Sequence, residues 1–471
     1  MTENVYYAET HVFGVENIPS DGEPIMIASN HQYSLNDALG ILLAINDRKP
    51  NFIVRADVFA ISKGFGKFLR AIGLLPAFRI GHEGSGAFAK NQDTFSMSEK
   101  ALAEGETVVI FPEGGHAEGH WLNIFKSGMA KMAFEAAAMT DFEKDIQIVP
   151  ACNHYSDYYG LRNRMLVQFG KPVSISQFYE LYKTKPRTAQ RRLLALVRER
   201  IESMVLDEKD KEFYEELEFL RNGEFGTEFA VSQGFIPYDF KEKFESDKLL
   251  LARFLEARKA ENPFLCILSS EEGQGIEELA KAQVDAQNGA RESAGSAKST
   301  GETESALLSV REYMKELSEA GITEHQISGN PSGFSTLMQS VALVLLLPLA
   351  VVCLWPSAIC WLLPKFFANR AQGRMFEGTF VLAMNIVAIF PLLGILSFAV
   401  VWMKTSLLMA LIYVLLFPLI CLFEWKYVRT LRENIANWKW RRCCRKKKTA
   451  QLEQMRDKLF SRLSKIVGIG D

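Results

Sequence analysis

The chain has 471 residues, more than one ordinary domain holds, and 48% of them are hydrophobic. Its 54 lysines and arginines nearly balance its 56 aspartates and glutamates, so that the formal net charge is −2. This balance argues against a general nucleic-acid binder, and we expect no nucleic-acid partner. The first five residues (Met-Thr-Glu-Asn-Val) lack the basic and apolar regions of a secretory signal, and we expect the first domain to remain in the cytosol.

An apolar run near the N-terminus leads into a histidine and a carboxylate. Residues 24–28 (Pro-Ile-Met-Ile-Ala) predict a short buried strand, and His31 and Asp37 follow its end. Ligands of α/β sheets usually bind at that end of the strands. His31 could accept a proton at neutral pH while Asp37 orients it and stabilises the imidazolium. A histidine and an aspartate at this spacing more often form an ordinary surface or core pair, so this stretch alone does not establish chemistry.

Strands and helices alternate over the residues that follow, which is typical of an α/β fold with a mostly parallel sheet and flanking helices. The segment 58–72 mixes phenylalanines with basic residues; it is either an amphipathic packing helix, which we favour, or a membrane contact. We expect strands at 51–55, 107–110, 146–150 and 164–172, and helices at 38–44, 128–139 and 189–204.

Two basic residues are candidates for binding a phosphate. Arg79 follows the apolar run 74–78, and its planar fork can bind a phosphate through two parallel hydrogen bonds. A single arginine more often forms a surface ion pair. Lys126 is a second candidate with weaker support.

Glu113 lies where the strand 107–110 ends, and Gly114 and Gly115 allow a ligand to approach the backbone closely. His116 and His120 have the spacing of two metal ligands on a helix. The neighbouring glycines argue against a helix there and no third ligand stands out, so we expect loop residues and no metal site.

Taken in chain order, these motifs resemble those of the glycerolipid acyltransferase superfamily. They are Asn-His at 30–31 with Asp37, the arginine after 74–78, Phe-Pro-Glu-Gly-Gly at 111–115 and Ile-Val-Pro at 148–150. The resemblance covers residues 12–173, about a third of the chain. Each motif alone is weak, but their combination is specific. Enzymes of that family transfer a fatty acyl group from coenzyme A or acyl carrier protein to glycerol 3-phosphate, 1-acylglycerol 3-phosphate or a related alcohol.

One motif departs from the family's commonest form, which has four residues between the histidine and the aspartate. This chain has five, and the shorter spacing would end on Asn36. Branches resembling yeast-type glycerol-phosphate and dihydroxyacetone-phosphate acyltransferases carry the longer spacing, so we assign the acid role to Asp37. Asn36 stays an alternative that could orient His31, but a neutral amide could not stabilise an imidazolium by charge.

The resemblance implies a role for each motif residue. His31 would be the general base and Asp37 its orienting acid, and the acyl group would pass directly to the acceptor without a metal or another cofactor. The implied substrate-binding residues are Asn30, Ser34, Arg79, Glu113, Gly114, Gly115 and Lys126.

Four acceptors and one different class of protein remain open. The longer spacing favours glycerol 3-phosphate, with 1-acylglycerol 3-phosphate beside it; dihydroxyacetone phosphate or a lysophospholipid is the alternative. A second alternative is a non-catalytic membrane scaffold on the same fold. The presence of His31, Asp37, Arg79 and Glu113 together argues against a scaffold.

Three apolar stretches near the C-terminus, 338–363, 380–403 and 406–423, are long enough to cross the ~30 Å of hydrocarbon in a bilayer. The second and third are joined by a short turn at Lys404 and predict a helical hairpin. The first contains Pro348 and Pro356 and either crosses or re-enters. Basic residues around Arg370 and at 441–448 are expected on the cytosolic side, which requires an even number of crossings.

We therefore expect an integral membrane protein whose catalytic domain lies on the cytosolic face. Apolar residues 452, 455, 459, 463 and 466 mark one face of a last helix, which could lie on the membrane or pair with a partner. The predicted parts are an acyltransferase domain (1–205), a charged helical region (206–287), a disordered linker (288–305), a helical connector (306–337), a membrane region (338–424) and a basic flank with an amphipathic C-terminal helix (425–471).

Overall fold

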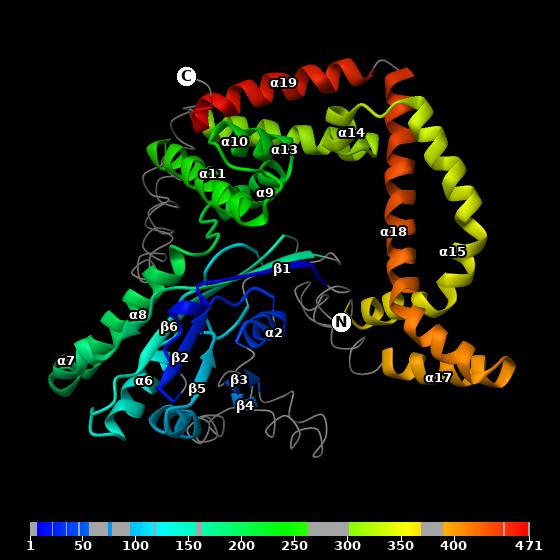
Figure 1. The fold of residues 1–471 in the computed structure, drawn as a ribbon. Helices are drawn as coiled ribbons and strands as arrows, with labels where there is room; N and C mark the ends of the chain where they lie inside the picture. The colour runs from blue at the N-terminus through cyan, green and yellow to red at the C-terminus, as the bar shows by residue number, and fades with distance from the viewer. Residues whose placement is uncertain are drawn as a thin grey trace. The chain divides into compact units, whose positions relative to one another are not determined.

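The computed structural model describes residues 7–20, 22–33, 35–45, 48–55, 74–77, 95–116, 119–156, 163–261, 301–368, 390–445 and 448–469. The chain divides into two compact units, which are Met1–Asp207 with Leu363–Ile386, and Glu208–Leu362 with Val387–Asp471. A sheet with helices makes up the first unit, and the described part of the second is helical (Figure 1). The predictions for the segment 58–72, Ser34 and Arg79 lie outside the described residues.

The described strands of the first unit form one mixed sheet. They are β1 (Tyr7–Phe13), β2 (Ile25–Ser29), β3 (Asn51–Arg55), β4 (Leu74–Ala77), β5 (Thr107–Ile110), β6 (Gln147–Tyr155), β7 (Asn163–Phe169) and β8 (Val173–Ser174). Their order is β1-β7-β6-β2-β5-β3-β4, with β8 paired to β6. The pairs that join β2 to β6, β2 to β5, β5 to β3, and β3 to β4 are parallel, as predicted. We did not predict that β6 pairs antiparallel with both β7 and β8, or that β1 forms an edge strand parallel to β7.

Strand β2 lies in the middle of this sheet because its side chains are apolar on both faces. All five of its residues are buried, as expected for a strand covered on both sides. Its register pairs Ala28 with Ile110 of β5, and Ser29 with Ala151 of β6. The C-terminal ends of β2 and β5 therefore lie side by side, and the residues that follow each strand come together.

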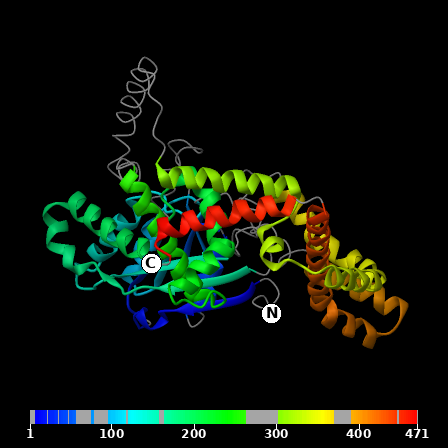
Figure 2. The ribbon, with the colours of Figure 1, turned by 90° about the horizontal axis from the view of Figure 1, so that it is seen from above.

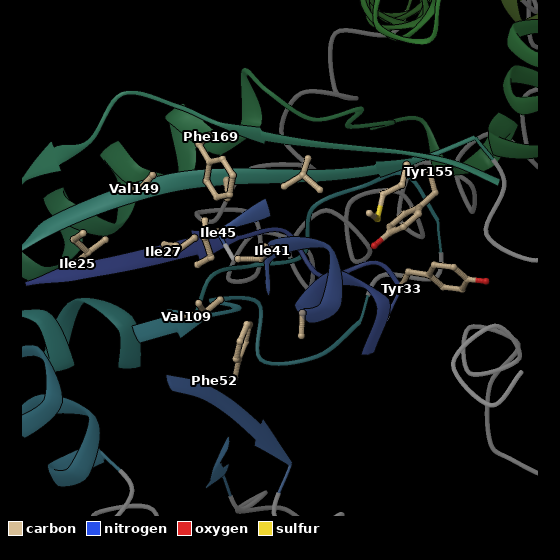
Figure 3. Packing of buried hydrophobic residues seen from close by; sticks show 14 of the residues in the cluster. Ile25, Ile27, Tyr33, Ile41, Ile45, Phe52, Val109, Val149, Tyr155 and Phe169 are labelled. Atoms are coloured by element: carbon tan, nitrogen blue, oxygen red, sulfur yellow. The ribbon is translucent and has the colours of Figure 1, made fainter. Parts of the chain in front are cut away.

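Helix α2 (Leu35–Ala44) packs its apolar side against the sheet. Ile41 and the following Ile45 join a buried cluster with side chains from β2, β5, β6 and β7 (Figure 3). Gly40 permits this close approach, because a Cβ there would lie 3.1 Å from both the Asn153 side chain and the Met165 sulfur. The other described helices of the unit are residues 95–103, α6 (Gly128–Ala138), α7 (Tyr179–Thr184) and α8 (Pro186–Glu202).

The second unit is a set of helices: α9 (Tyr214–Asn222), α10 (Glu224–Ser232), α11 (Phe240–Glu261), α13 (Glu302–Ala320), α14 (Glu324–Gly329), α15 (Gly333–Ala368), α17 (Phe390–Lys404), α18 (Leu407–Arg445) and α19 (Lys448–Val467). Helix α13 begins at Glu302, so the last residues of the predicted linker are helical. Residues 262–300, which include the rest of that linker, lie outside the described residues.

The C-terminal helix α19 differs from its prediction in what covers its apolar face. Leu452, Leu459 and Leu463 are buried, and the helix contacts α11 and α13 of the same unit. Figures 1 and 2 both show α19 (red) running beside α13. The predicted face is thus covered by helices of its own chain.

Two long helices, α15 and α18, carry most of the exposed apolar side chains. The part of α15 at Gly333–Cys353 is long and apolar enough to cross a bilayer, with a mean hydropathy of 2.3. Two parts of α18, Leu407–Phe417 and Leu419–Arg445, meet this criterion only when taken together, and they are bent by 45°. Helix α15 continues through Pro348 and Pro356 without a break.

Helices α17 and α18 pack against each other within the predicted hairpin, whose residues 380–389 lie outside the described residues, and α18 runs on through Arg445 into the predicted basic flank. Polar side chains join α15 to α18. The amide nitrogen of Asn434 donates to the Thr336 carbonyl and to Oε1 of Gln339, both at 3.0 Å. Its Oδ1 accepts the hydroxyl of Ser340 at 2.9 Å, and the indole N–H of Trp438 donates to the same hydroxyl.

Candidate active site

His31 and Asp37 meet at the C-terminal end of β2. His31 follows the strand by two residues, and Asp37 lies in the first turn of α2. His31 Nδ1 is 2.9 Å from Oδ2 of Asp37. Because a carboxylate only accepts hydrogen bonds, Nδ1 carries a proton and the opposite ring nitrogen, Nε2, is the basic one. The structure thus brings together the pair that the sequence predicted.

Asp37 is fully buried, and hydrogen bonds compensate for the burial of its charge. Its Oδ2 also accepts the backbone N–H groups of Gln32 and Tyr33, at 2.9 and 2.8 Å. Its Oδ1 accepts the hydroxyl of Tyr155, at 2.9 Å. The positive end of the α2 dipole adds to this stabilisation. The five-residue spacing therefore forms a loop whose own backbone binds the carboxylate.

Asn36 does not take the orienting role that was left open for it. Its side chain is fully buried, and neither of its amide atoms has a hydrogen-bond partner among the described residues. The carboxylate that contacts His31 belongs to Asp37.

Glu113 holds the loop that carries His31. Its Oε1 accepts the backbone N–H of His31 at 2.7 Å, and its Oε2 accepts the backbone N–H of Asn123 at 2.8 Å. Burial raises the pKa of Glu113 to about 8, although the two backbone donors oppose this shift. Both carboxyl oxygens thus bind backbone, and the contact with the acceptor that the resemblance implied stays a prediction.

Asn30 also binds backbone instead of facing outward. Its Nδ2 donates to the carbonyl of Asn153 at 2.9 Å, and its Oδ1 accepts the N–H of Asn153 at 2.8 Å. The amide of Asn153 donates in turn to the hydroxyl of Ser29 at 3.1 Å. These bonds join the end of β2 to β6. Asn30 therefore holds in place the strand end that leads into His31.

The imidazole of His31 lies between two rings. Phe111 stacks on it with ring centres 4.1 Å apart, and His116 lies 4.0 Å away at a tilt of 55°. The sequence indicated only a loop residue at His116, and nothing in its spacing pointed to His31. The described residues hold no group of three or more His, Cys, Asp or Glu side chains suited to a metal ion.

The turn formed by Gly114 and Gly115 lies beside Lys126. Gly114 adopts a left-handed φ of 65°, and a Cβ there would lie 3.2 Å from the Lys126 side chain. The Lys126 backbone N–H donates to the carbonyl of Pro112 at 2.7 Å, while its side chain is exposed. Gly115 has open space around it. The turn and the lysine are therefore neighbours in the structure.

Comparisons with known proteins found similarity over the part of the chain that holds these residues. Residues 9–154 match the family model described as Acyltransferase. Glycerol-3-phosphate O-acyltransferase 2 of Saccharomyces cerevisiae is 34% identical over 105 residues, which are 22% of this chain and 14% of that protein. A chloroplastic 1-acyl-sn-glycerol-3-phosphate acyltransferase of Brassica napus is 28% identical over 134 residues, or 28% of this chain and 35% of that one. The chain thus matches only a minor part of the length of each relative.

A solved structure with a detectable likeness is the 1-acyl-sn-glycerophosphate (LPA) acyltransferase PlsC of Thermotoga maritima. It is 18% identical, and the alignment covers 40% of this chain and 72% of that chain with a TM-score of 0.27.

Proposed function

We propose that this chain, which carries an acyltransferase-family domain over residues 9–154, transfers a fatty acyl group from acyl-CoA or acyl carrier protein to a glycerol-phosphate hydroxyl. The observation that carries the proposal is the His31–Asp37 contact of 2.9 Å at the end of β2. Asp37 there accepts hydrogen bonds from four donors, and the paired histidine keeps one nitrogen for a substrate.

The chemistry follows from the two nitrogens of His31. Nε2 accepts the proton of the acceptor hydroxyl while the oxygen attacks the thioester carbonyl. Asp37, bound to Nδ1, stabilises the imidazolium that forms. When the carbon–sulfur bond breaks, the imidazolium returns the proton to the leaving thiolate. The products are the acyl ester and the free thiol, and the base is restored.

The acceptor we favour is glycerol 3-phosphate or 1-acylglycerol 3-phosphate. The names of the two relatives contain these two compounds. Lys126, beside the Gly114 turn, and Arg79 are the candidates for the phosphate. Dihydroxyacetone phosphate and a lysophospholipid are the alternative acceptors. A scaffold without activity would have no need of a fully buried carboxylate that is bound to a histidine.

The exposed apolar side chains of α15 and α18 support attachment to a membrane. Val344, Leu345 and Leu415, for example, are 67%, 74% and 75% exposed. We propose that these helices anchor the chain and that the acyltransferase domain lies on the cytosolic side. Such an anchor suits an enzyme whose product belongs in the bilayer.

The test is acyl transfer by the purified full chain in detergent. Radiolabelled acyl-CoA and acyl carrier protein are each offered with the four acceptors, and the rates of wild type and His31→Ala are compared. We expect His31→Ala to lose ~10³-fold or more. The control is His11→Ala on the edge strand β1, where the ring lies beside Glu9 and outside the site. Equal rates for wild type and His31→Ala would contradict the proposal.

A further inference from the structure

The two oxygens of the Asp37 carboxylate have different kinds of partner. Oδ2 is bound within its own loop, by the ring of His31 and the N–H groups of Gln32 and Tyr33. Oδ1 is bound from another part of the chain, by the hydroxyl of Tyr155 at 2.9 Å. Tyr155 ends β6 and lies 118 positions from Asp37 in the sequence. Both side chains are fully buried.

This second bond adds to the contacts that hold the carboxylate in one orientation. The last torsion of an aspartate side chain is soft and has broad energy wells. A donor that holds Oδ1 therefore directs Oδ2 toward His31. Without that donor, Oδ2 keeps its bonds to His31, Gln32 and Tyr33, and more of the carboxylate's negative charge is left to them.

The Tyr155 ring is itself fixed in place. Tyr33 meets it edge-on with ring centres 5.0 Å apart, and Tyr7 stacks beside it at 6.3 Å. Figure 3 shows Tyr155 and Tyr33 together at the edge of the buried cluster, next to α2. Burial and the nearby charge of Asp37 raise the pKa of Tyr155 well above its ordinary value, so its hydroxyl remains a donor at any working pH.

We propose that Tyr155 is a positioning residue of the acyl-transfer site, whose hydroxyl orients Asp37 toward His31 and limits how strongly Asp37 attracts the imidazolium proton. This inference rests on the proposed function. It has a definite electrostatic consequence, because each hydrogen bond donated to a carboxylate withdraws part of its negative charge. Removal of the Tyr155 hydroxyl leaves more charge facing His31, and His31 then holds its proton to higher pH.

The test is Tyr155→Phe in the full chain, which keeps the ring and removes only the hydroxyl. We expect kcat to fall about 10- to 100-fold, the effect of losing one hydrogen bond to a charged group. The KM for the acceptor should change little, because Tyr155 is fully buried. The acid limb of the pH–rate profile should move up by ~0.5 pH unit or more.

The matched control is Tyr179→Phe. Tyr179 lies in the same unit and donates its hydroxyl to the Lys144 carbonyl at 2.7 Å. It is also buried, but its partner is a neutral backbone group. We expect this variant to keep the wild-type kcat and the wild-type pH profile.

A double variant separates positioning from a general loss of packing. In an Asp37→Asn background there is no carboxylate charge to direct, so Tyr155→Phe should then change kcat less than ~3-fold. An equal loss in both backgrounds would overturn the proposal. So would a Tyr155→Phe enzyme with an unmoved acid limb.

A measurement that needs no activity keeps the inference distinct from the proposed function. The protonation of His31 is followed by ¹⁵N NMR of histidine-labelled chain, in wild type and in Tyr155→Phe. A midpoint that rises in the variant supports the inference, and an unchanged midpoint overturns it. If wild type transfers no acyl group to any acceptor, the proposed function fails while this titration still decides the role of Tyr155.

Discussion

The Glu113 carboxyl group combines deep burial with two backbone hydrogen bonds. Only 3% of the residue is exposed, and its oxygens bind the N–H groups of His31 and Asn123. Burial favours the neutral form and raises the pKa from 4.5 to about 8. The backbone of the proposed base is therefore held by a group that can bind a proton near neutral pH.

This burial predicts a pH dependence of folding stability. Between pH 4.5 and about 8, native Glu113 binds a proton that the unfolded chain releases. Stability should therefore fall as pH rises through this window, by up to ~1.4 kcal/mol per pH unit. Glu113→Gln cannot ionise and should show a flatter decline. Urea unfolding of both proteins at pH 5, 6.5 and 8 measures the difference.

The control for this experiment is a variant at an exposed carboxylate. Glu143→Gln replaces an exposed carboxylate of the same unit and should leave the pH dependence as in wild type. Parallel stability curves for wild type and Glu113→Gln would show that Glu113 does not carry the raised pKa.

The contact between His31 and Asp37 was predictable because both residues follow one strand and share one loop. The other side chains that contact this pair were not predictable. Tyr155 reaches Asp37 only because β6 lies next to β2 in the sheet, and the order of the strands could not be inferred from the sequence. The backbone bonds of Glu113 could not be predicted for a similar reason, since the sequence does not show which backbone groups a side chain will bind.

Among the elements, the turn after β1 depends on a glycine. Gly14 has φ +76°, and a Cβ there would lie 2.0 Å from the Phe169 carbonyl oxygen of β7. The same oxygen accepts the side-chain amide of Asn17 at 2.9 Å. This glycine therefore lets the edge strand β1 end close against β7.

We predict that Gly14→Ala destabilises the first unit far more than Gly22→Ala does. Gly22 also has a positive φ, of +91°, but a Cβ added there would have no described atom within 4 Å. Gly22→Ala should cost about 1 kcal/mol from backbone conformation alone, and Gly14→Ala about 3 kcal/mol because it adds a clash with backbone. Thermal unfolding of the two variants compares them. Equal losses would mean that β1 can shift to make room.

The elements with apolar patterns were predicted well, and those that depend on their neighbours were not. Strands β2 and β5 are apolar except for one terminal residue each, so their burial could be inferred directly. Strand β1 (Tyr7–Phe13) carries three consecutive polar residues between two apolar pairs and lies at a sheet edge, and no motif marked it. The amphipathic pattern of α19 identified a covered face but could not say that α11 and α13 cover it.

At the scale of the molecule, the exposed apolar surfaces of α15 and α18 predict how the chain partitions. We expect it to stay in the membrane fraction after washes with concentrated salt and with alkaline carbonate, because exposed leucines and valines gain more from lipid than from water. Detergent should release it. Recovery in the supernatant after the salt wash alone would show attachment through charge and contradict an anchor.

The polar contacts around Asn434 have a consequence for how the two long helices fit. Each helix repeats every ~5.4 Å, and an apolar pair could slide by one such step at little cost. A slide would take Asn434 away from Ser340 and from the Thr336 carbonyl. A buried amide that has lost its hydrogen-bond partners raises the free energy of the helix pair. A single buried asparagine can therefore select one alignment of two helices from several. The hydrogen bonds of Asn434 thus fix the register of α18 against α15.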